Sequence, residues 1–198
     1  NNPEATFMNF GNKNIDHLNF NTDYFDVIAL GPGLSTNEKT ITAFHHFLTE
    51  CELPILIDAD GLNIIAKLYL HNIIPANSIL TPHPGEFDRL FGKHDNDEAR
   101  RITQLKKSKE LCLYIILKGT YTTISTPDGK LYYNMTGNPG MATGGSGDIL
   151  LGILAGLLGQ GYEKSQACRL AVFLHGTAGD LAAKELTENC MISTDIIK

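Results

Sequence analysis

A glycine-rich loop that leads into an apolar helix carries the first sign of chemistry. The stretch GNPGMATGGSGDILLGILAGLLGQGY, residues 137–162, contains nine glycines. A helix that begins near Gly145 leaves its first amide N–H groups without helical partners, and the positive end of its dipole attracts anions. Gly144, Gly145 and Gly147 permit positive φ and close approach of a ligand, while Ser146 adds a hydroxyl donor. The loop is therefore predicted to hold a phosphate group, although it matches neither the P-loop nor the Rossmann pattern.

Asp148 follows these glycines directly. A carboxylate in the first turn of a helix often caps amide groups, and this structural role stays open from the sequence alone. The functional alternative is a base that accepts the proton of a substrate hydroxyl while a phosphoryl group arrives. The helix dipole favours the ionised, weakly basic form, but a loose phosphoryl-transfer transition state needs mainly positioning and charge neutralisation.

Four further polar motifs each follow an apolar run of strand length. Because ligands of parallel α/β sheets bind beyond the carboxyl ends of the strands, these motifs are predicted to share one site with the glycine loop. In one of them Lys118 offers a charge to phosphate, although K-G after a strand is often only a turn. In another, His83 lies between two prolines that restrict the backbone, which suits either a ligand contact or a structural role. The motifs are GPGLS (31–35), DADGLN (58–63), TPHPGE (81–86) and KGTYT (118–122).

The elements that position these motifs alternate between strand and helix. The pattern predicts βαβ units with a mostly parallel sheet, followed by an edge hairpin around TPDG and two final helices. The first of these two is apolar nearly all round, so we expect it to be buried, with Gly152, Gly156 and Gly159 permitting a close approach. The predicted strands are 25–30, 54–58, 78–81 and 113–118; the predicted helices are 36–50, 61–70, 85–91, 98–110, 145–158 and 165–186.

Composition limits the class of protein. The chain has 198 residues, 42% of them hydrophobic and 19% charged, with a formal net charge of −6, which favours one domain over residues 1–198 and argues against nucleic acid as a partner. No signal peptide or membrane-length apolar run is visible, so a cytoplasmic location without membrane contact is predicted.

Basic residues between 98 and 110 are expected to form a solvated face. The cysteines at 51, 112, 168 and 190 form no C-x-x-C pair, so buried free thiols are expected rather than a zinc site or disulfides.

These motifs together carry a resemblance. The glycine loop resembles the anion-hole segment of the ribokinase-like superfamily. With DVIALGPGLS, LIDADGLN, LTPHPGEFDRL, ILKGTYTTIS and FLHGTAGDLA in the same order, the chain looks like a member of the NAD(P)H-hydrate dehydratase family of the YjeF C-terminal domain type. The resemblance implies a ribokinase-like αβα sandwich, with a mostly parallel sheet and an edge hairpin. It also implies a repair reaction, in which ADP or ATP phosphorylates the 6-hydroxyl of hydrated NADH or NADPH and phosphate is then eliminated.

The resemblance also implies roles for individual residues. Asp148 becomes the catalytic base, and Gly33 and His83 would face the hydrated dinucleotide together with Asp148. From their chemistry, Asn63 and Asn138 are expected as substrate-side hydrogen-bond donors, and His175 is expected to bond within its own helix. Mg2+ is implied by phosphoryl transfer in general, with its ligands unknown. The nucleotide site is expected at Lys118, Gly119, Thr120, Tyr121, Thr122, Gly144, Gly145, Ser146 and Gly147.

Departures from the family pattern leave alternatives open. Ser35 stands where the family commonly has Gly, and Ser146 where it often has Thr. Relatives usually carry a further N-terminal segment, which we expect this chain to lack, and many carry a fused epimerase domain. A homo-oligomer, in particular a tetramer, is expected from the resemblance. The alternative functions are a ribokinase-like small-molecule kinase of the hydroxyethylthiazole or hydroxymethylpyrimidine type, or a nucleotide-binding fragment without catalysis.

Overall fold

A six-stranded sheet in the order β1-β2-β3-β4-β5-β6 forms the centre of the computed structural model, which describes residues 15–197. The first four strands run parallel and the last two are antiparallel, so the predicted parallel sheet with an edge hairpin is confirmed. Each strand is shorter than the apolar run that predicted it. The strands are β1 (Ala29–Leu30), β2 (Leu56–Ile57), β3 (Ile79–Leu80), β4 (Tyr114–Leu117), β5 (Thr123–Ser125) and β6 (Leu131–Tyr133).

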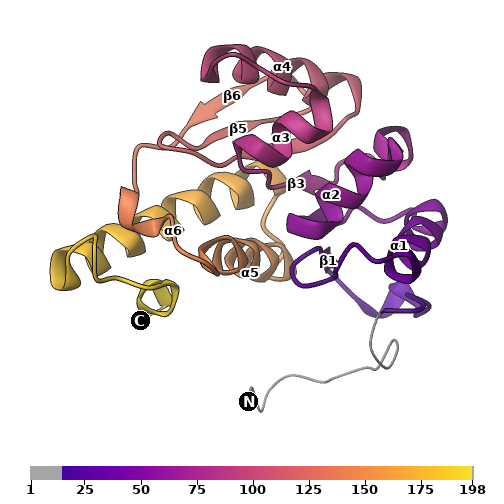
Figure 1. Ribbon diagram of the computed structural model, residues 1–198, viewed down its shortest axis with the longest axis horizontal. Helices are drawn as coiled ribbons and strands as arrows, with labels where there is room; N and C mark the ends of the chain where they lie inside the picture. Colours follow the sequence, from indigo (N-terminus) through magenta and orange to yellow (C-terminus); the bar gives the residue numbers. More distant parts are fainter. Residues whose placement is uncertain (1–14, 198) are drawn as a thin grey trace.

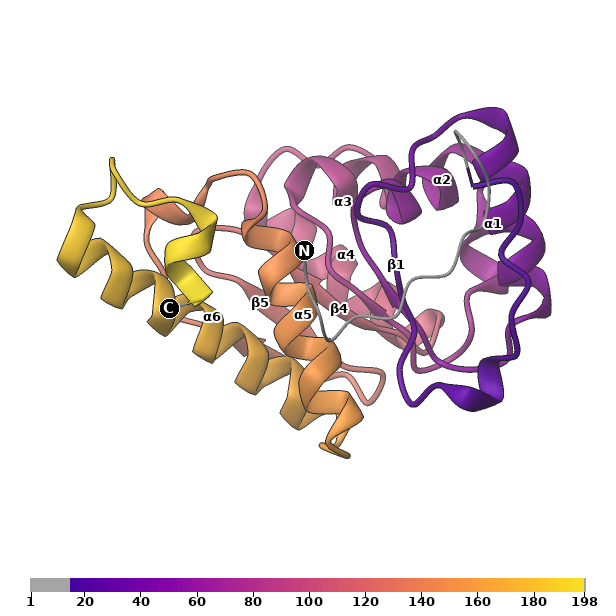
Figure 2. The same cartoon turned by 90° about the horizontal axis from the view of Figure 1, so that it is seen from below.

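Helices cover both faces of the sheet. Four helices connect strands whose order in the sheet follows their order in the chain, and right-handed crossovers then place all four on one face. The two last helices lie together on the other side, as Figures 1 and 2 show. The helices are α1 (Glu38–Glu50), α2 (Ala59–Leu68), α3 (Pro84–Phe91), α4 (Asp97–Glu110), α5 (Ser146–Gly159) and α6 (Lys164–Leu186), with short 3-10 turns η1 (Thr22–Tyr24), η2 (Leu70–Ile73), η3 (Pro139–Met141) and η4 (Ser193–Ile197).

The strands are buried on both faces, as parallel strands between two helical layers must be. Ile57, Leu80 and Leu117 belong to the apolar cluster under α1 to α3, whereas Leu56 and Ile116 belong to the cluster under α5 and α6. Because side chains alternate along a strand, the residues two positions after Leu56 and Ile116 also face α5. This alternation places Asp58 and Lys118 on the α5 side of the strand ends.

Helix α5 departs from the expectation that it is buried all round. Its buried residues include Leu150, Leu154 and Leu157, which pack on the sheet. Gly152, Gly156 and Gly159 lie on the exposed side, and a Cβ built at any of them meets no atom of residues 15–197 within 4 Å. The predicted close approach is therefore absent from the described residues. Nor is any helix in this part of the chain long and apolar enough to cross a membrane.

The cysteines are free thiols in the described residues, but only one of them is fully buried. Cys168 lies on the buried face of α6, and burial raises its pKa far above the usual thiol value. Cys112 and Cys190 are exposed because they lie in the turns that follow α4 and α6. The expectation of buried thiols is wrong for these two.

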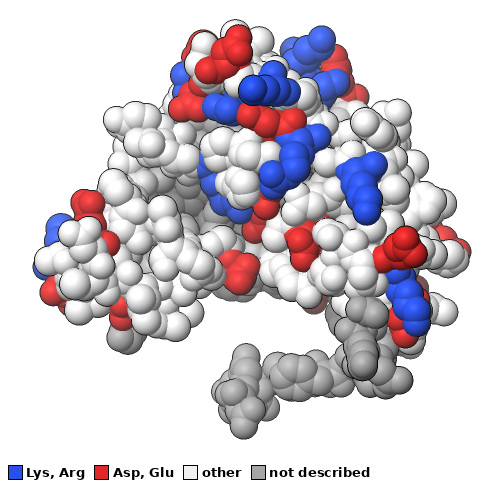
Figure 3. All heavy atoms as spheres, in the orientation of Figure 1, with Lys and Arg blue, Asp and Glu red and all other residues white. Residues whose placement is uncertain are grey.

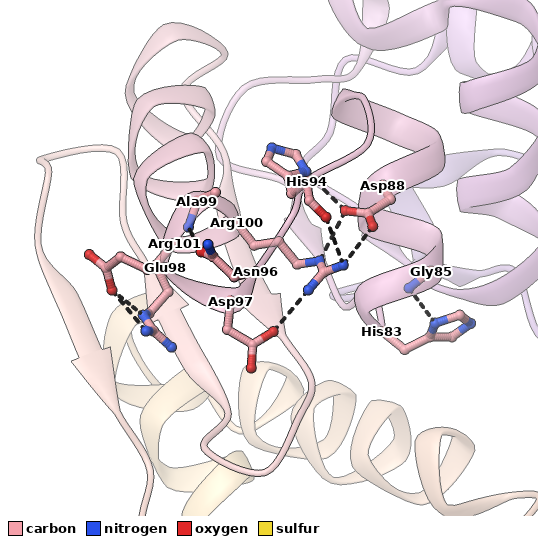
Figure 4. A network of polar contacts seen from close by, with 10 residues as sticks. All are labelled: His83, Gly85, Asp88, His94, Asn96, Asp97, Glu98, Ala99, Arg100 and Arg101. Carbon is pink, nitrogen blue, oxygen red and sulfur yellow. Dashed lines mark hydrogen bonds and ion pairs between the residues drawn. The ribbon is translucent and has the colours of Figure 1, made fainter.

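An ion-pair network joins α3, the loop after it and α4. Arg100 reaches from α4 to Asp88 on α3 with Nη2–Oδ2 2.7 Å and Nε–Oδ1 3.0 Å, and His94 Nδ1 lies 2.9 Å from the same carboxylate (Figure 4). The side chains of Arg100 and His94 are only 17% and 9% exposed. The prediction of a solvated basic face is therefore wrong for Arg100, although Lys106 is exposed as expected. The network fixes α3, whose first turn belongs to the site described below.

Replacing Asp88 by Asn is expected to lower the free energy of unfolding by about 2 kcal/mol near neutral pH, because hydrogen bonds to charged groups contribute roughly 1.5–3 kcal/mol. The Arg100 guanidinium, helped by His94, holds the pKa of Asp88 below its ordinary value. This stabilisation is therefore present above the unfolded carboxyl pKa of about 3.9 and is lost as the pH falls through the lower pKa of the folded state. Urea unfolding at several pH values should show the difference between wild type and Asp88→Asn shrinking on acidification.

Arg101→Ala is the matched control, because its partner Glu98 is 67% exposed and such pairs contribute less than about 1 kcal/mol. Equal losses for Asp88→Asn and Arg101→Ala would contradict the role given to the network.

Candidate active site

A cavity of about 640 Å³ opens where the carboxyl end of β4 meets the first turn of α5 and the middle of α6. Figure 3 shows this face of the molecule hollowed between the region of α3 and α4 and that of α6. The cavity walls combine small polar residues with a few apolar side chains, as ligand sites usually do. The predicted site residues that line the cavity are His83, Lys118, Gly119, Thr120, Thr122, Asn138, Ser146 and Gly147.

The first turn of α5 has the geometry of an anion site. Gly145 precedes the helix with φ 88°, a conformation that favours glycine, and no side chain of residues 15–197 caps the helix. The Ser146 amide donates to Thr143 O at 3.3 Å, whereas the Gly147 and Asp148 amides keep their capacity to donate to a ligand. This arrangement agrees with the phosphate-binding prediction made from the sequence.

Lys118 and Asp58 form an ion pair against this turn. Lys118 Nζ lies 2.9 Å from Asp58 Oδ1, although the two residues are sixty positions apart in the chain. A Cβ built on Gly147 would lie 3.3 Å from Lys118 Nζ and 3.5 Å from Asp58 Oδ2. The charged groups of Lys118 and Asp58 thus lie against the start of α5. They can do so because Gly147 has no side chain.

His175 on α6 joins the same group. Its Nε2 lies 3.2 Å from Ser146 Oγ, so the expected hydrogen bond within its own helix is wrong. Burial lowers the pKa of His175, and the nearby Lys118 charge lowers it further. The imidazole therefore adds no positive charge to the cavity at neutral pH.

His83 begins α3 as its N-cap. Its Nδ1 accepts hydrogen bonds from the amides of Gly85 (3.0 Å, Figure 4) and Glu86 (3.4 Å), and its own amide donates to Glu86 Oε2 at 2.8 Å. This reciprocal capping fixes the ring at the mouth of the cavity. The imidazole combines a structural role with a ligand-facing position, because the side chain remains 51% exposed.

The residues predicted on the substrate side are less closely gathered. Asn63 Oδ1 accepts from Arg89 Nε at 2.9 Å, which leaves its amide nitrogen available. Asn138 donates to Asp180 Oδ1 at 3.0 Å and accepts from the Gly140 amide, so its side chain orders the loop before α5. Gly33 has φ 68° and open space around it. Its loop and Asn63 lie outside the residues that line the cavity.

Asp148 lies in the first turn of α5 and is exposed. Within residues 15–197 its carboxylate has neither an ion pair nor a hydrogen bond with another side chain. An approaching ligand can therefore reach it. Asp148 does not itself line the cavity, although Gly147 before it does. Tyr121, Gly144 and Gly145 do not line the cavity either, but each is next in sequence to a residue that does.

Two residues of this site had no site role among the sequence predictions: Asp58, which begins the predicted motif DADGLN without a role of its own, and His175, which was expected to bond within its helix. Asp58 is the first residue after β2 and lies two positions beyond Leu56, so strand alternation could have placed it on the α5 face. No sequence signal brings His175 to Ser146, because the packing of α6 on α5 decides that contact.

Comparison with known proteins agrees with this arrangement. A family model described as NAD(P)H-hydrate dehydratase matches residues 3–198. The ADP-dependent (S)-NAD(P)H-hydrate dehydratase of Bacillus subtilis is 35% identical over 98% of this chain and 69% of its own length. The chain also matches curated bifunctional NAD(P)H-hydrate repair enzymes but spans only about a third of their length. That of Thermofilum pendens is 42% identical over 87% of this chain and 33% of its own length.

Solved structures give the same result. The B. subtilis ADP/ATP-dependent NAD(P)H-hydrate dehydratase co-crystallised with ATP/Mg2+ is 33% identical, with a TM-score of 0.73 over 86% of this chain and 61% of that one. A ribokinase-like superfamily protein from Enterococcus faecalis V583 has 32% identity and a TM-score of 0.77 over 86% and 60% of the two chains. With a ribokinase-like fold and a family match over nearly its whole length, the chain belongs to the NAD(P)H-hydrate dehydratase family.

Proposed function

We propose that the chain catalyses the nucleotide-dependent dehydration of hydrated NAD(P)H to NAD(P)H, as an ADP- or ATP-dependent carbon–oxygen lyase. The observation that carries the proposal is the first turn of α5, where Lys118 Nζ lies beside Gly147 and the exposed Asp148 follows Gly147 in the chain. This site offers donors for a transferable phosphoryl group and a carboxylate for a hydroxyl proton. The names of the relatives supply the substrate class.

The proposed reaction has two steps. In the first, Asp148 accepts the proton of the 6-hydroxyl while the hydroxyl oxygen forms a bond to the terminal phosphorus of the nucleotide. The bond from that phosphorus to the bridging oxygen of the nucleotide breaks. The α5 amides and Lys118 balance the negative charge of the phosphoryl group. In the second step, the carbon–oxygen bond breaks with its electron pair on phosphate, and loss of a proton from the neighbouring ring carbon restores the double bond.

The nucleotide contacts follow the same logic. Gly119, Thr120 and Thr122 line the cavity beside Lys118, so we place the phosphates of the nucleotide along this loop. Tyr121, which is 56% exposed, would lie toward the adenosine. The hydrated ring would approach from the side of His83 and Gly33, so that its hydroxyl meets Asp148.

Mg2+ fits this site as a partner of the nucleotide. The described residues contain no cluster of three or more His, Cys, Asp or Glu that could hold a metal. Mg2+ usually needs only one or two carboxylates beside substrate phosphates and water, and Asp58 Oδ2 faces Gly147 without a protein hydrogen bond within residues 15–197. The ion would neutralise phosphate charge, with Asp58 and Asp60 as the nearest acids on this segment of the chain.

We further infer a homo-oligomer, for which a tetramer is the family expectation, working in the cytoplasm where NAD(P)H is used. The exposed apolar side chains of Phe173, Leu174 and Leu181 on α6 support association between copies.

The decisive experiment incubates the protein with hydrated NADH, Mg2+ and either ADP or ATP, while following the near-ultraviolet absorption of NADH and the release of phosphate. Equal amounts of NADH and phosphate, lost on removing Mg2+ with a chelator, are expected. A lasting phosphorylated product would indicate a small-molecule kinase instead. Nucleotide binding by calorimetry without turnover would indicate a binding fragment.

A further inference from the structure

The carboxylate of Asp58 lies almost completely inside the protein at the end of β2. The residue is 2% exposed, and its Oδ1 accepts two hydrogen bonds, from the Ala59 amide at 2.9 Å and from Lys118 Nζ at 2.9 Å. An ionised carboxylate in such a place requires a charged partner. Lys118 is the one cation that the described residues bring to it.

The lysine reaches this partner across a neighbouring strand. Asp58 follows β2 and Lys118 follows β4, with β3 between them, and both side chains point to the α5 face of the sheet. Two separate strand ends therefore fix the two ends of the contact. The pair is part of the rigid centre of the sheet rather than of a surface loop.

Without Asp58 the ammonium would have much greater freedom. A lysine side chain is a flexible stem of four carbons, and the Lys118 side chain is 22% exposed and lines the cavity. The ion pair selects the conformation in which Nζ lies beside Gly147, where the phosphoryl group is expected. Phosphoryl transfer depends mainly on such positioning, and a misplacement of about 1 Å can cost roughly 100-fold in rate.

We propose that Asp58 is a positioning residue that holds Lys118 against the first turn of α5 for phosphoryl transfer. This inference rests on the proposed function of the site. Asp58 Oδ1 acts through Lys118 and also caps α2 through the Ala59 amide. Its Oδ2 is the oxygen left for Mg2+, so the assays below are run at saturating Mg2+.

Asp58→Asn separates these two roles. Asparagine caps a helix as well as aspartate does, so α2 should stay intact, while the lost ion pair should lower the melting temperature as in Asp88→Asn without unfolding the protein at the assay temperature. The charge that holds Lys118 is lost. In steady-state assays of the whole chain with hydrated NADH and ADP or ATP, we expect kcat to fall about 100-fold while KM for the hydrate stays nearly constant.

Lys118→Met and the double variant test whether the two residues act as a unit. If Asp58 acts through Lys118, adding Asp58→Asn to Lys118→Met should change kcat little further, because coupled residues are not additive. Asp97→Asn is the matched control, since this acid on α4 is 72% exposed and is not among the residues that line the cavity. The proposal would be overturned if the fold-loss of kcat in the double variant equalled the product of the two single losses. An unchanged kcat in Asp58→Asn would also overturn it.

A second readout does not depend on turnover. Acylation of Lys118 by an acetyl ester at limiting concentration, followed by peptide mass spectrometry, should be slow in the wild type because Asp58 holds Nζ against Gly147 and only 22% of the side chain is exposed. Asp58→Asn should accelerate it several-fold, with no change at the exposed Lys39. An inactive wild type with this acceleration would contradict the proposed function alone, and an equal labelling rate would contradict the positioning role.

Discussion

Asp148→Asn is expected to abolish most of the turnover of hydrated NAD(P)H while leaving nucleotide affinity almost unchanged. General-base catalysis contributes on the order of 10²–10⁴ in rate, and asparagine cannot accept the hydroxyl proton. The substitution keeps the size of the side chain in an exposed position, so packing is not disturbed. Removing one negative charge from the first turn of α5 is expected to leave phosphate binding intact or to strengthen it slightly.

The measurement compares kcat with ADP and with ATP, together with nucleotide affinity by calorimetry. Asp97→Asn serves again as the control with the same chemical change at a remote exposed site. A variant with wild-type kcat would refute Asp148 as the base. Loss of nucleotide binding in parallel with kcat would instead give the carboxylate a role in organising the loop.

Gly31→Ala is expected to cost more than about 4 kcal/mol in the free energy of unfolding, a size reached only by severe local conflicts. A Cβ on Gly31 would lie 1.7 Å from the carbonyl oxygen of Asp58, and the residue has φ 140°. The backbone cannot move aside easily, because the Asp58 amide donates to Leu30 O at 3.0 Å and the Gly61 amide donates to Asp58 O at 3.0 Å. The same change displaces the carboxylate that pairs with Lys118.

Gly33→Ala is the matched control two residues further along the same loop. Gly33 has φ 68°, but a Cβ built there meets no atom of the described residues 15–197 within 4 Å. Only the strain of a left-handed conformation remains, which costs roughly 1–2 kcal/mol. Urea unfolding should therefore separate the two variants clearly; equal midpoints would contradict the close contact between Gly31 and Asp58.

The sequence predicted the fold well where apolar runs and punctuating residues agree. Four short apolar runs bounded by Gly, Pro or Asp predicted four parallel strands, and TPDG predicted the edge hairpin. The glycine loop predicted the uncapped helix start of α5 from the backbone chemistry of its residue types. The resemblance to the dehydratase family rests on the same motifs, and the family match confirms it.

Contacts made by side chains across the fold could not be read in the same way. Arg100 looks like part of a solvated stripe, yet α3 packs close enough to bury it against Asp88. His175 looks like a helix residue with local partners, but it bonds to Ser146 on another helix. The roles of Gly33, Asn63 and Asn138 at the substrate remain predictions, because the cavity wall includes only the last of them.

The cap at the start of α3 decides which proton His83 carries. Its Nδ1 receives amide hydrogens from Gly85 and Glu86, so this nitrogen must present a lone pair and the neutral ring must hold its hydrogen on Nε2. Nε2 lies 3.5 Å from Glu86 Oε1, and a bound dinucleotide would meet a donor rather than an acceptor there. Accepting a substrate proton at Nδ1 would break the cap of α3, which makes His83 unsuited to replace Asp148 as the proton acceptor.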